Sequence, residues 1–124
     1  MVLDVFREDE PTTRVPVQVR RLDNYLADTG LDTVSLVKID TEGFEFPVLF
    51  GMSRFLDATA HRPPMIVEIV PWAAPLLEHS LSDGAAWLAK YGYRACRLDD
   101  ARRGIDITQL TETTDVLLLP SDNG

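Results

Sequence analysis

The chain has 124 residues, of which 45% are hydrophobic, and this size and apolar content fit one small domain with a packed core. Its formal net charge of -8 argues against a nucleic-acid-binding surface, because phosphate contacts need clustered Lys and Arg. A single cysteine excludes an intramolecular disulfide, and the sequence shows neither a signal peptide nor a membrane-length apolar run, so we expect a cytoplasmic protein.

Two strands and a helix are expected in the first third of the chain. Residues 15–20 alternate apolar and polar side chains, which predicts a half-exposed strand. Residues 22–26 carry apolar side chains at helical spacing, and Gly30 follows where a C-terminal cap belongs. The mostly apolar run 34–40 predicts a strand that is covered on both faces and ends in a carboxylate, Asp40.

A longer helix and another buried strand are expected next. From Phe44 to Leu56 the apolar side chains fall on one helical face, which predicts a single helix facing the core. Gly51 lies inside this helix at a cost of about 1 kcal/mol relative to Ala, and a close contact with the sheet would explain it. Residues 65–70 then predict a buried strand.

The last third of the chain predicts one helix and two strands. Ser82 can cap a helix over 83–91, and strands are expected over 93–98 and 115–120 with a polar loop between them. Strands that alternate with helices predict an α/β fold with a largely parallel sheet. No helix is expected between the last two strands, so the final strand is expected to be antiparallel.

The turn after the strand over 34–40 is the candidate functional region. The strand delivers Asp40 to its carboxyl end, and Thr41-Glu42-Gly43 leads directly into the following helix. Ligands of open α/β sheets bind in the crevice beyond such strand ends. Gly43 supplies the backbone freedom that so short a turn requires.

Asp40, Glu42 and Glu68 are the candidate catalytic residues. If the strands over 34–40 and 65–70 are neighbours, these carboxylates converge, where they would orient an acceptor hydroxyl, act as a base or hold a hard metal ion. The alternative is that they cap a helix and solvate the strand ends. We assign no metal ligand.

Five other side chains are expected to be structural or superficial. Glu45 is expected to be a charge at a helix N-terminus, and His61 and His79 are expected at the surface. Cys96 is expected to be a small buried hydrophobe. For Trp72 two roles stay open, one in an acceptor pocket and one in packing.

The region around Asp40 resembles the FkbM-type S-adenosylmethionine-dependent methyltransferases, whose hallmark is a hydrophobic strand followed by K-I-D-x-E-G-x-E-x-x-V-L-x-G. The residues that match this motif are Lys38, Ile39, Asp40, Glu42, Gly43, Glu45, Val48, Leu49 and Gly51. Three further elements match in order, namely a strand with L-D-x-x-L over 15–26, a proline-led strand ending in Glu over 64–68, and L-x-x-x-G-Y over 88–93.

The resemblance implies a Rossmann-like class I methyltransferase sheet, S-adenosyl-L-methionine as cofactor, and O-methylation of a small-molecule or glycan hydroxyl. Full members also carry an earlier D-x-G-A-N-x-G segment and an E-P element. In this sequence neither is present, and no two of the seven glycines are closer than eight residues, so we assign no cofactor-binding residue.

The chain is therefore expected to be the C-terminal half of such a domain. The domain is expected over residues 15–120, with an N-terminal extension over 1–14 and a tail over 121–124. The expected partner is a small-molecule or glycan acceptor, with no nucleic acid and no membrane.

Two alternatives to a methyltransferase stay open. One is a non-catalytic half-domain that associates with another chain, as a homodimer or with a complementing chain, because missing strands would leave an unpaired sheet edge. The other is a hydrolase or another α/β enzyme that uses the carboxylates alone. No Gly-x-Ser-x-Gly elbow or reactive cysteine supports this last interpretation.

Overall fold

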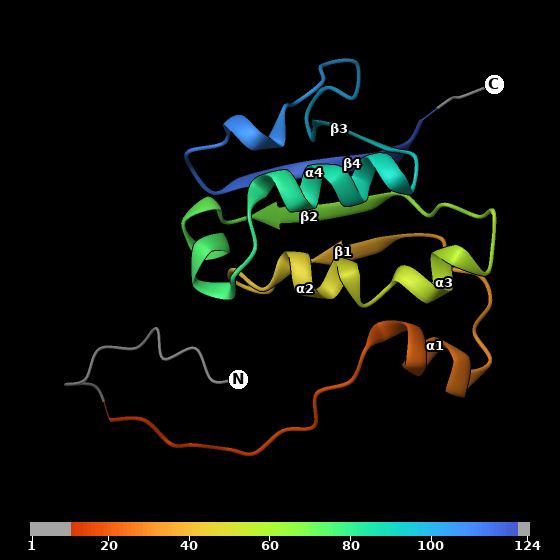
Figure 1. Cartoon of the computed structure of the whole chain (residues 1–124), viewed down its shortest axis with the longest axis vertical. Helices are drawn as coiled ribbons and strands as arrows, with labels where there is room; N and C mark the ends of the chain where they lie inside the picture. Colours follow the sequence, from red (N-terminus) through yellow and green to blue (C-terminus); the bar gives the residue numbers. More distant parts are fainter. Residues whose placement is uncertain (1–10, 122–124) are drawn as a thin grey trace.

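The computed structural model describes residues 11–121, which fold into a four-stranded sheet with helices packed on it (Figure 1). The strands are β1 (Val37–Ile39), β2 (Met65–Ile69), β3 (Tyr93–Arg97) and β4 (Thr114–Pro120). The α-helices are α1 (Leu22–Thr29), α2 (Glu45–Phe50), α3 (Ser53–Asp57) and α4 (Leu81–Lys90), and the 3-10 helices are η1 (Pro71–Leu77) and η2 (Ile107–Gln109). The α/β class is confirmed.

The strand order across the sheet is β1-β2-β4-β3. β1 pairs in parallel with β2, whereas β4 is antiparallel to both β2 and β3. The final strand is therefore reversed, as the sequence predicts, but the sheet is mixed rather than largely parallel by its neighbouring pairs. Because β1, β2 and β3 point the same way, their carboxyl ends lie at one edge of the sheet, together with the start of β4.

Helices α2, α3 and α4 lie on the same face of the sheet (Figure 1). Side chains alternate between two faces along a strand. On β4, Val116 and Leu118 point to the helix-covered face and are buried, whereas Leu117 and Leu119 are partly exposed. β2 shows the same alternation of buried and partly exposed residues. We call the second face the open face, and the core lies between the first face and the helices.

Several elements lie where the sequence predicts them. α1 ends at Gly30, which adopts a left-handed φ of 72° as its C-cap, and β2, β3 and β4 match their predicted ranges to within a residue at each end. The sequence patterns did not indicate the 3-10 helix η1. Among the described residues, no helix has the length and apolar character that a membrane span requires.

The strand predicted over 15–20 is absent, because these residues are extended but pair with no strand in the described part of the chain. Val15, Val17 and Val19 are 71%, 78% and 84% exposed. An alternating pattern makes a strand only when a neighbour accepts its backbone hydrogen bonds. The strand predicted over 34–40 is also shorter, and it is not covered on both faces, since Lys38 is exposed.

The single helix predicted from Phe44 to Leu56 is interrupted at Gly51. Gly51 is the C-cap of α2, and its carbonyl accepts a hydrogen bond of 2.8 Å from the backbone N–H of Asp23. A Cβ atom added to Gly51 would lie 3.5 Å from the backbone nitrogen of Leu22. The close contact expected at this glycine is therefore with the start of α1 and not with the sheet.

The N-cap of α4 is Ser80 and not Ser82. The Ser80 hydroxyl accepts a hydrogen bond of 3.0 Å from the backbone N–H of Asp83, whose carboxylate accepts one of 2.9 Å from the Ser80 N–H. This is a capping box, whereas Ser82 lies exposed in the first turn.

We expect Ser80→Ala to lower the free energy of unfolding by about 1 kcal/mol, because it removes an acceptor from the first turn of α4. Ser82→Ala should change it by less than about 0.5 kcal/mol, as usual for an exposed substitution without a structural role. Urea unfolding of both variants measures the difference. A larger effect from Ser82→Ala would contradict the assigned cap.

Candidate functional site

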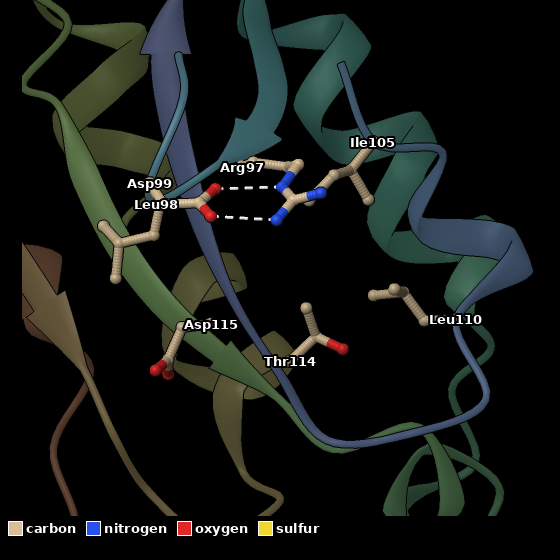
Figure 2. Close-up of a pocket in the computed structure, with 7 residues that line it drawn as sticks. All are labelled: Arg97, Leu98, Asp99, Ile105, Leu110, Thr114 and Asp115. Carbon is tan, nitrogen blue, oxygen red and sulfur yellow. Dashed lines mark hydrogen bonds and ion pairs between the residues drawn. The ribbon is translucent and has the colours of Figure 1, made fainter. Parts of the chain in front are cut away.

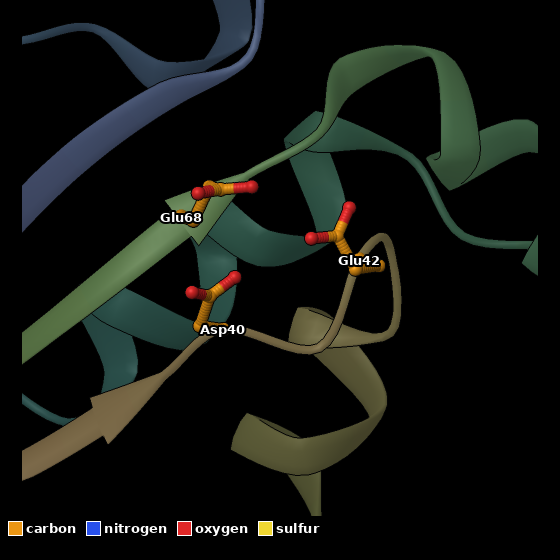
Figure 3. Close-up of side chains that lie close together, drawn as sticks. All are labelled: Asp40, Glu42 and Glu68. Atoms are coloured by element: carbon orange, nitrogen blue, oxygen red, sulfur yellow. The ribbon is translucent and has the colours of Figure 1, made fainter.

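Asp40, Glu42 and Glu68 converge at the carboxyl ends of β1 and β2 (Figure 3). The parallel register pairs Ile39 with Val67, so the residues that follow on both strands emerge at the same edge. One carboxylate oxygen from each of the three lies within 4.8 Å of those of the other two. The convergence expected from sequence is present because its condition, that the two strands are neighbours, is met.

The turn between β1 and α2 positions Glu42. Glu42 adopts a left-handed φ of 54° and Gly43 a φ of 112°. A Cβ atom on Gly43 would lie only 2.7 Å from the Cβ of Ala73, so the turn packs tightly against η1. Left-handed backbone at a residue other than glycine costs about 1–3 kcal/mol and persists only where the surroundings hold it. Packing against η1 supplies such a support for Glu42.

Glu45 fixes this turn from inside the fold. Its side chain is buried, and its Oε1 atom accepts a hydrogen bond of 2.9 Å from the backbone N–H of Gly43. A carboxylate at the beginning of α2 is also favoured by the helix dipole. Glu45 therefore stabilises the turn that carries Glu42, in agreement with the structural role expected from sequence.

A fourth carboxylate belongs to the same edge of the sheet. Asp115 on β4 is the register partner of Glu68, so the two side chains lie on the open face, at close cross-strand distance. Burial and the negative charges of Asp40, Glu42 and Asp115 raise the pKa of Glu68. Sequence reasoning missed Asp115, because its place beside Glu68 depends on the strand order. We call these four residues the carboxylate cluster.

The carboxylate cluster is chemically suited to a few tasks. Ionised carboxylates accept hydrogen bonds from hydroxyl groups and attract cations, and hard divalent metals prefer oxygen ligands of this kind. A carboxylate whose pKa is raised is also a stronger base than an ordinary one. The same crowding of like charges makes the cluster a source of instability when all members are ionised.

We expect Glu68→Gln to raise the thermal unfolding temperature at pH 7, because it removes charge repulsion from the carboxylate cluster. Since the pKa of Glu68 is higher in the folded than in the unfolded state, the wild type loses stability as the pH rises through the folded-state pKa. The gain should therefore shrink as the pH falls below about 4, where the carboxyl is protonated in both states.

Thermal unfolding between pH 3 and pH 7 checks this expectation. Glu112→Gln is the matched control, because Glu112 is an exposed carboxylate in the loop before β4. It should give no gain with the same pH dependence. A stabilisation by Glu68→Gln that persists unchanged at pH 3 would refute the repulsion argument.

Two cavities border the carboxylate cluster. The smaller cavity, of about 290 Å³, is lined by Lys38, Ile39, Asp40, Ile66, Glu68, Leu98 and Asp115. The larger cavity, of about 540 Å³, is lined by Arg97, Leu98, Asp99, Ile105, Leu110, Thr114 and Asp115 (Figure 2). Leu98 and Asp115 belong to both linings, so the two cavities are adjacent along the strand-end edge.

The remaining residues considered from sequence lie apart from the carboxylate cluster. His61 is exposed, with its Nε2 atom 2.6 Å from the carbonyl oxygen of Val34, and His79 packs edge-on against Phe50. Cys96 is fully buried, as expected. Trp72 is 60% exposed on η1, which does not fit the packing role that was one of its two alternatives.

A family model described as the methyltransferase FkbM domain matches residues 3–95. The match covers more than half of the chain and includes Asp40, Glu42 and Glu68, but it ends before β4. Neither the curated proteins nor the solved structures gave a match.

Proposed function

Because this chain belongs to the FkbM methyltransferase family, we propose that it acts in the S-adenosylmethionine-dependent O-methylation of a small-molecule or glycan hydroxyl. The observation that carries the proposal is the convergence of Asp40, Glu42 and Glu68 at one sheet edge, inside the segment that the family model matches. We also propose that the sheet is the C-terminal half of a Rossmann-like sheet. Its support is the common direction of β1, β2 and β3.

The carboxylates would act on the acceptor hydroxyl. Asp40 and Glu42 would accept hydrogen bonds from the acceptor and hold its reacting oxygen in place, which is the main requirement of a displacement reaction. Glu68 is the preferred base, because burial and its negatively charged neighbours raise its pKa. Since Glu68 is partly exposed, the proton that it takes can pass on to water.

The cofactor supplies an electrophilic methyl group on a positively charged sulfur. The negative charge of the carboxylate cluster fits that positive charge, and this is the support for binding at the strand-end edge. The sequence, however, has no glycine-rich loop to hold the rest of the cofactor. We therefore propose that this chain contributes the acceptor side of the site and that other polypeptide completes the cofactor side.

Calorimetric titration with S-adenosylmethionine and S-adenosylhomocysteine tests the proposal, because the two ligands differ by the charged methyl group. We expect saturable binding of both, with S-adenosylmethionine bound severalfold more tightly. This preference should disappear in the double variant Asp40→Asn, Glu42→Gln, because the attracting charges are removed. Glu112→Gln should preserve it.

The absence of saturable binding by a chain shown to be folded would contradict an active site in this chain alone. An equal affinity of the wild type for both ligands would contradict the assignment of the carboxylate cluster to the reacting sulfur. Circular dichroism of each variant provides the check on folding.

The exposed segment over 15–19 favours a second candidate function, in which the chain is a half-domain that associates with another chain. Val15, Val17 and Val19 lie on one side of an extended backbone and are more than two-thirds exposed. β1 is an edge strand of the described sheet. Unpaired extended backbone with apolar side chains is prone to pair with another strand.

Size-exclusion chromatography with light scattering tests this association. An oligomer that becomes a monomer in Val17→Asp would support it, because a buried charge is costly at a strand interface. A monomeric wild type would contradict association between copies of this chain. Thr13→Asp, close by in the same segment, is the control for added charge alone.

A further inference from the structure

We propose that the two adjacent cavities form one acceptor groove, which takes an elongated, non-anionic alcohol with an apolar body. The groove runs along the strand-end edge from the carboxylate cluster to the larger cavity between β3 and β4. This inference rests on the proposed function, because that function places the reacting hydroxyl at Asp40 and Glu68. It adds the shape and charge of the molecule that carries the hydroxyl.

The strand order gives the length of the acceptor groove. β4 lies between β2, which carries Glu68, and β3, which ends at Arg97. Neighbouring strands are about 4.8 Å apart, so the two ends of the groove are separated by about 10 Å. This separation is similar to the length of two linked six-membered rings. A molecule of that length can place one hydroxyl at the carboxylate cluster while its other end occupies the larger cavity.

The larger cavity has an apolar side and a polar side (Figure 2). Ile105 and Leu110 come from the loop that returns from β3 to β4, and their side chains point into the cavity. The Thr114 hydroxyl and the Arg97 guanidinium approach from the strands. A volume of about 540 Å³ with mostly apolar walls and a few polar groups is typical of small-molecule pockets.

The charges along the acceptor groove select against anions. Arg97 donates hydrogen bonds of 2.9 Å and 2.8 Å to Asp99, so its positive charge is already neutralised. Asp115 and the rest of the carboxylate cluster then leave the groove with a net negative charge. A phosphorylated or carboxylated acceptor would be repelled, whereas an uncharged alcohol would not.

A pair of fluorescent probes with the same ring skeleton tests both features of the groove. N-phenyl-1-naphthylamine is uncharged, and 8-anilinonaphthalene-1-sulfonate adds one sulfonate to the same rings. We expect the uncharged probe to bind saturably, with one molecule per chain, and the sulfonate to bind at least tenfold more weakly. Leu110→Arg should weaken the uncharged probe at least tenfold, because it places a long charged side chain in the apolar wall.

Leu76→Arg is the matched control, because Leu76 is an exposed leucine on η1 outside both cavity linings. It should leave the affinity unchanged. Leu110 also packs partly against the core, so circular dichroism must show that Leu110→Arg is folded. If that variant is unfolded, the smaller change Leu110→Gln takes its place, with an expected loss of at least threefold.

The results distinguish the groove from the proposed function. Equal probe affinity in the Leu110 and Leu76 variants would overturn the groove, and a tighter binding of the sulfonate would overturn its charge preference. S-adenosylmethionine titrated into the same samples reports on the methyltransferase site independently. Leu110-sensitive probe binding without any cofactor binding would contradict the proposed function and still support the groove.

Discussion

Replacing Gly43 with Ala should lower the free energy of unfolding by about 2–4 kcal/mol. Gly43 has a φ of 112°, which L-residues rarely adopt, and this backbone conformation alone costs about 1–3 kcal/mol for Ala. The added Cβ atom would also lie 2.7 Å from the Cβ of Ala73, so the turn or η1 must move. Urea unfolding monitored by circular dichroism measures the loss.

Gly104→Ala is the control for this substitution. At Gly104 the nearest atom to an added Cβ is the carbonyl oxygen of Ala95 at 3.9 Å, an ordinary contact, and φ is not left-handed. Its effect should stay within about 0.5 kcal/mol, as for most surface changes. If Gly43→Ala proves equally mild, the turn is not tightly held, and the strained placement of Glu42 loses its explanation.

Leu118→Ala should cost about 3–5 kcal/mol, the second large effect that we expect. Leu118 is 1% exposed on the helix-covered face of β4, where truncation removes apolar contacts and leaves a cavity. Leu119→Ala, on the adjacent residue, should cost only about 1 kcal/mol, because Leu119 lies partly exposed on the open face. Urea unfolding of both variants at one protein concentration gives the two values.

The comparison between the two leucines also tests whether the open face is covered in solution. A cost for Leu119→Ala close to that of Leu118→Ala would mean that other polypeptide buries Leu119. Repeating the measurement at a tenfold higher protein concentration then separates the cases, because stability that depends on association rises with concentration. A small and concentration-independent cost agrees with the sheet as described.

The elements that the sequence predicts well are those fixed by their own local pattern. α1 and its Gly30 cap, β2, β3 and β4 each carry a clear periodicity and a boundary residue. The break between α2 and α3 has no such signal, because the apolar period continues across it. That break depends on a tertiary hydrogen bond, in which Asp23 donates to the Gly51 carbonyl from a distant part of the chain.

The candidate site follows the same division. Asp40 and Glu68 were predictable as neighbours because both follow buried strands, and parallel strands end at one edge. Asp115 was not predictable, because nothing local places β4 beside β2 rather than at the sheet margin. The strand predicted over 15–20 fails for a related reason, since a pattern identifies a strand but not whether a partner is available.

The position of β4 constrains the order in which this protein can fold during synthesis. β4 is the last strand to be translated, yet it separates β2 from β3 and hydrogen-bonds to both. While residues 114–120 are still inside the ribosome, only the short β1–β2 pair can form, and β3 has no neighbouring strand. The nascent chain thus exposes the apolar side chains of β2 and β3 until translation passes residue 120. Chaperones that bind such exposed segments have this interval in which to act.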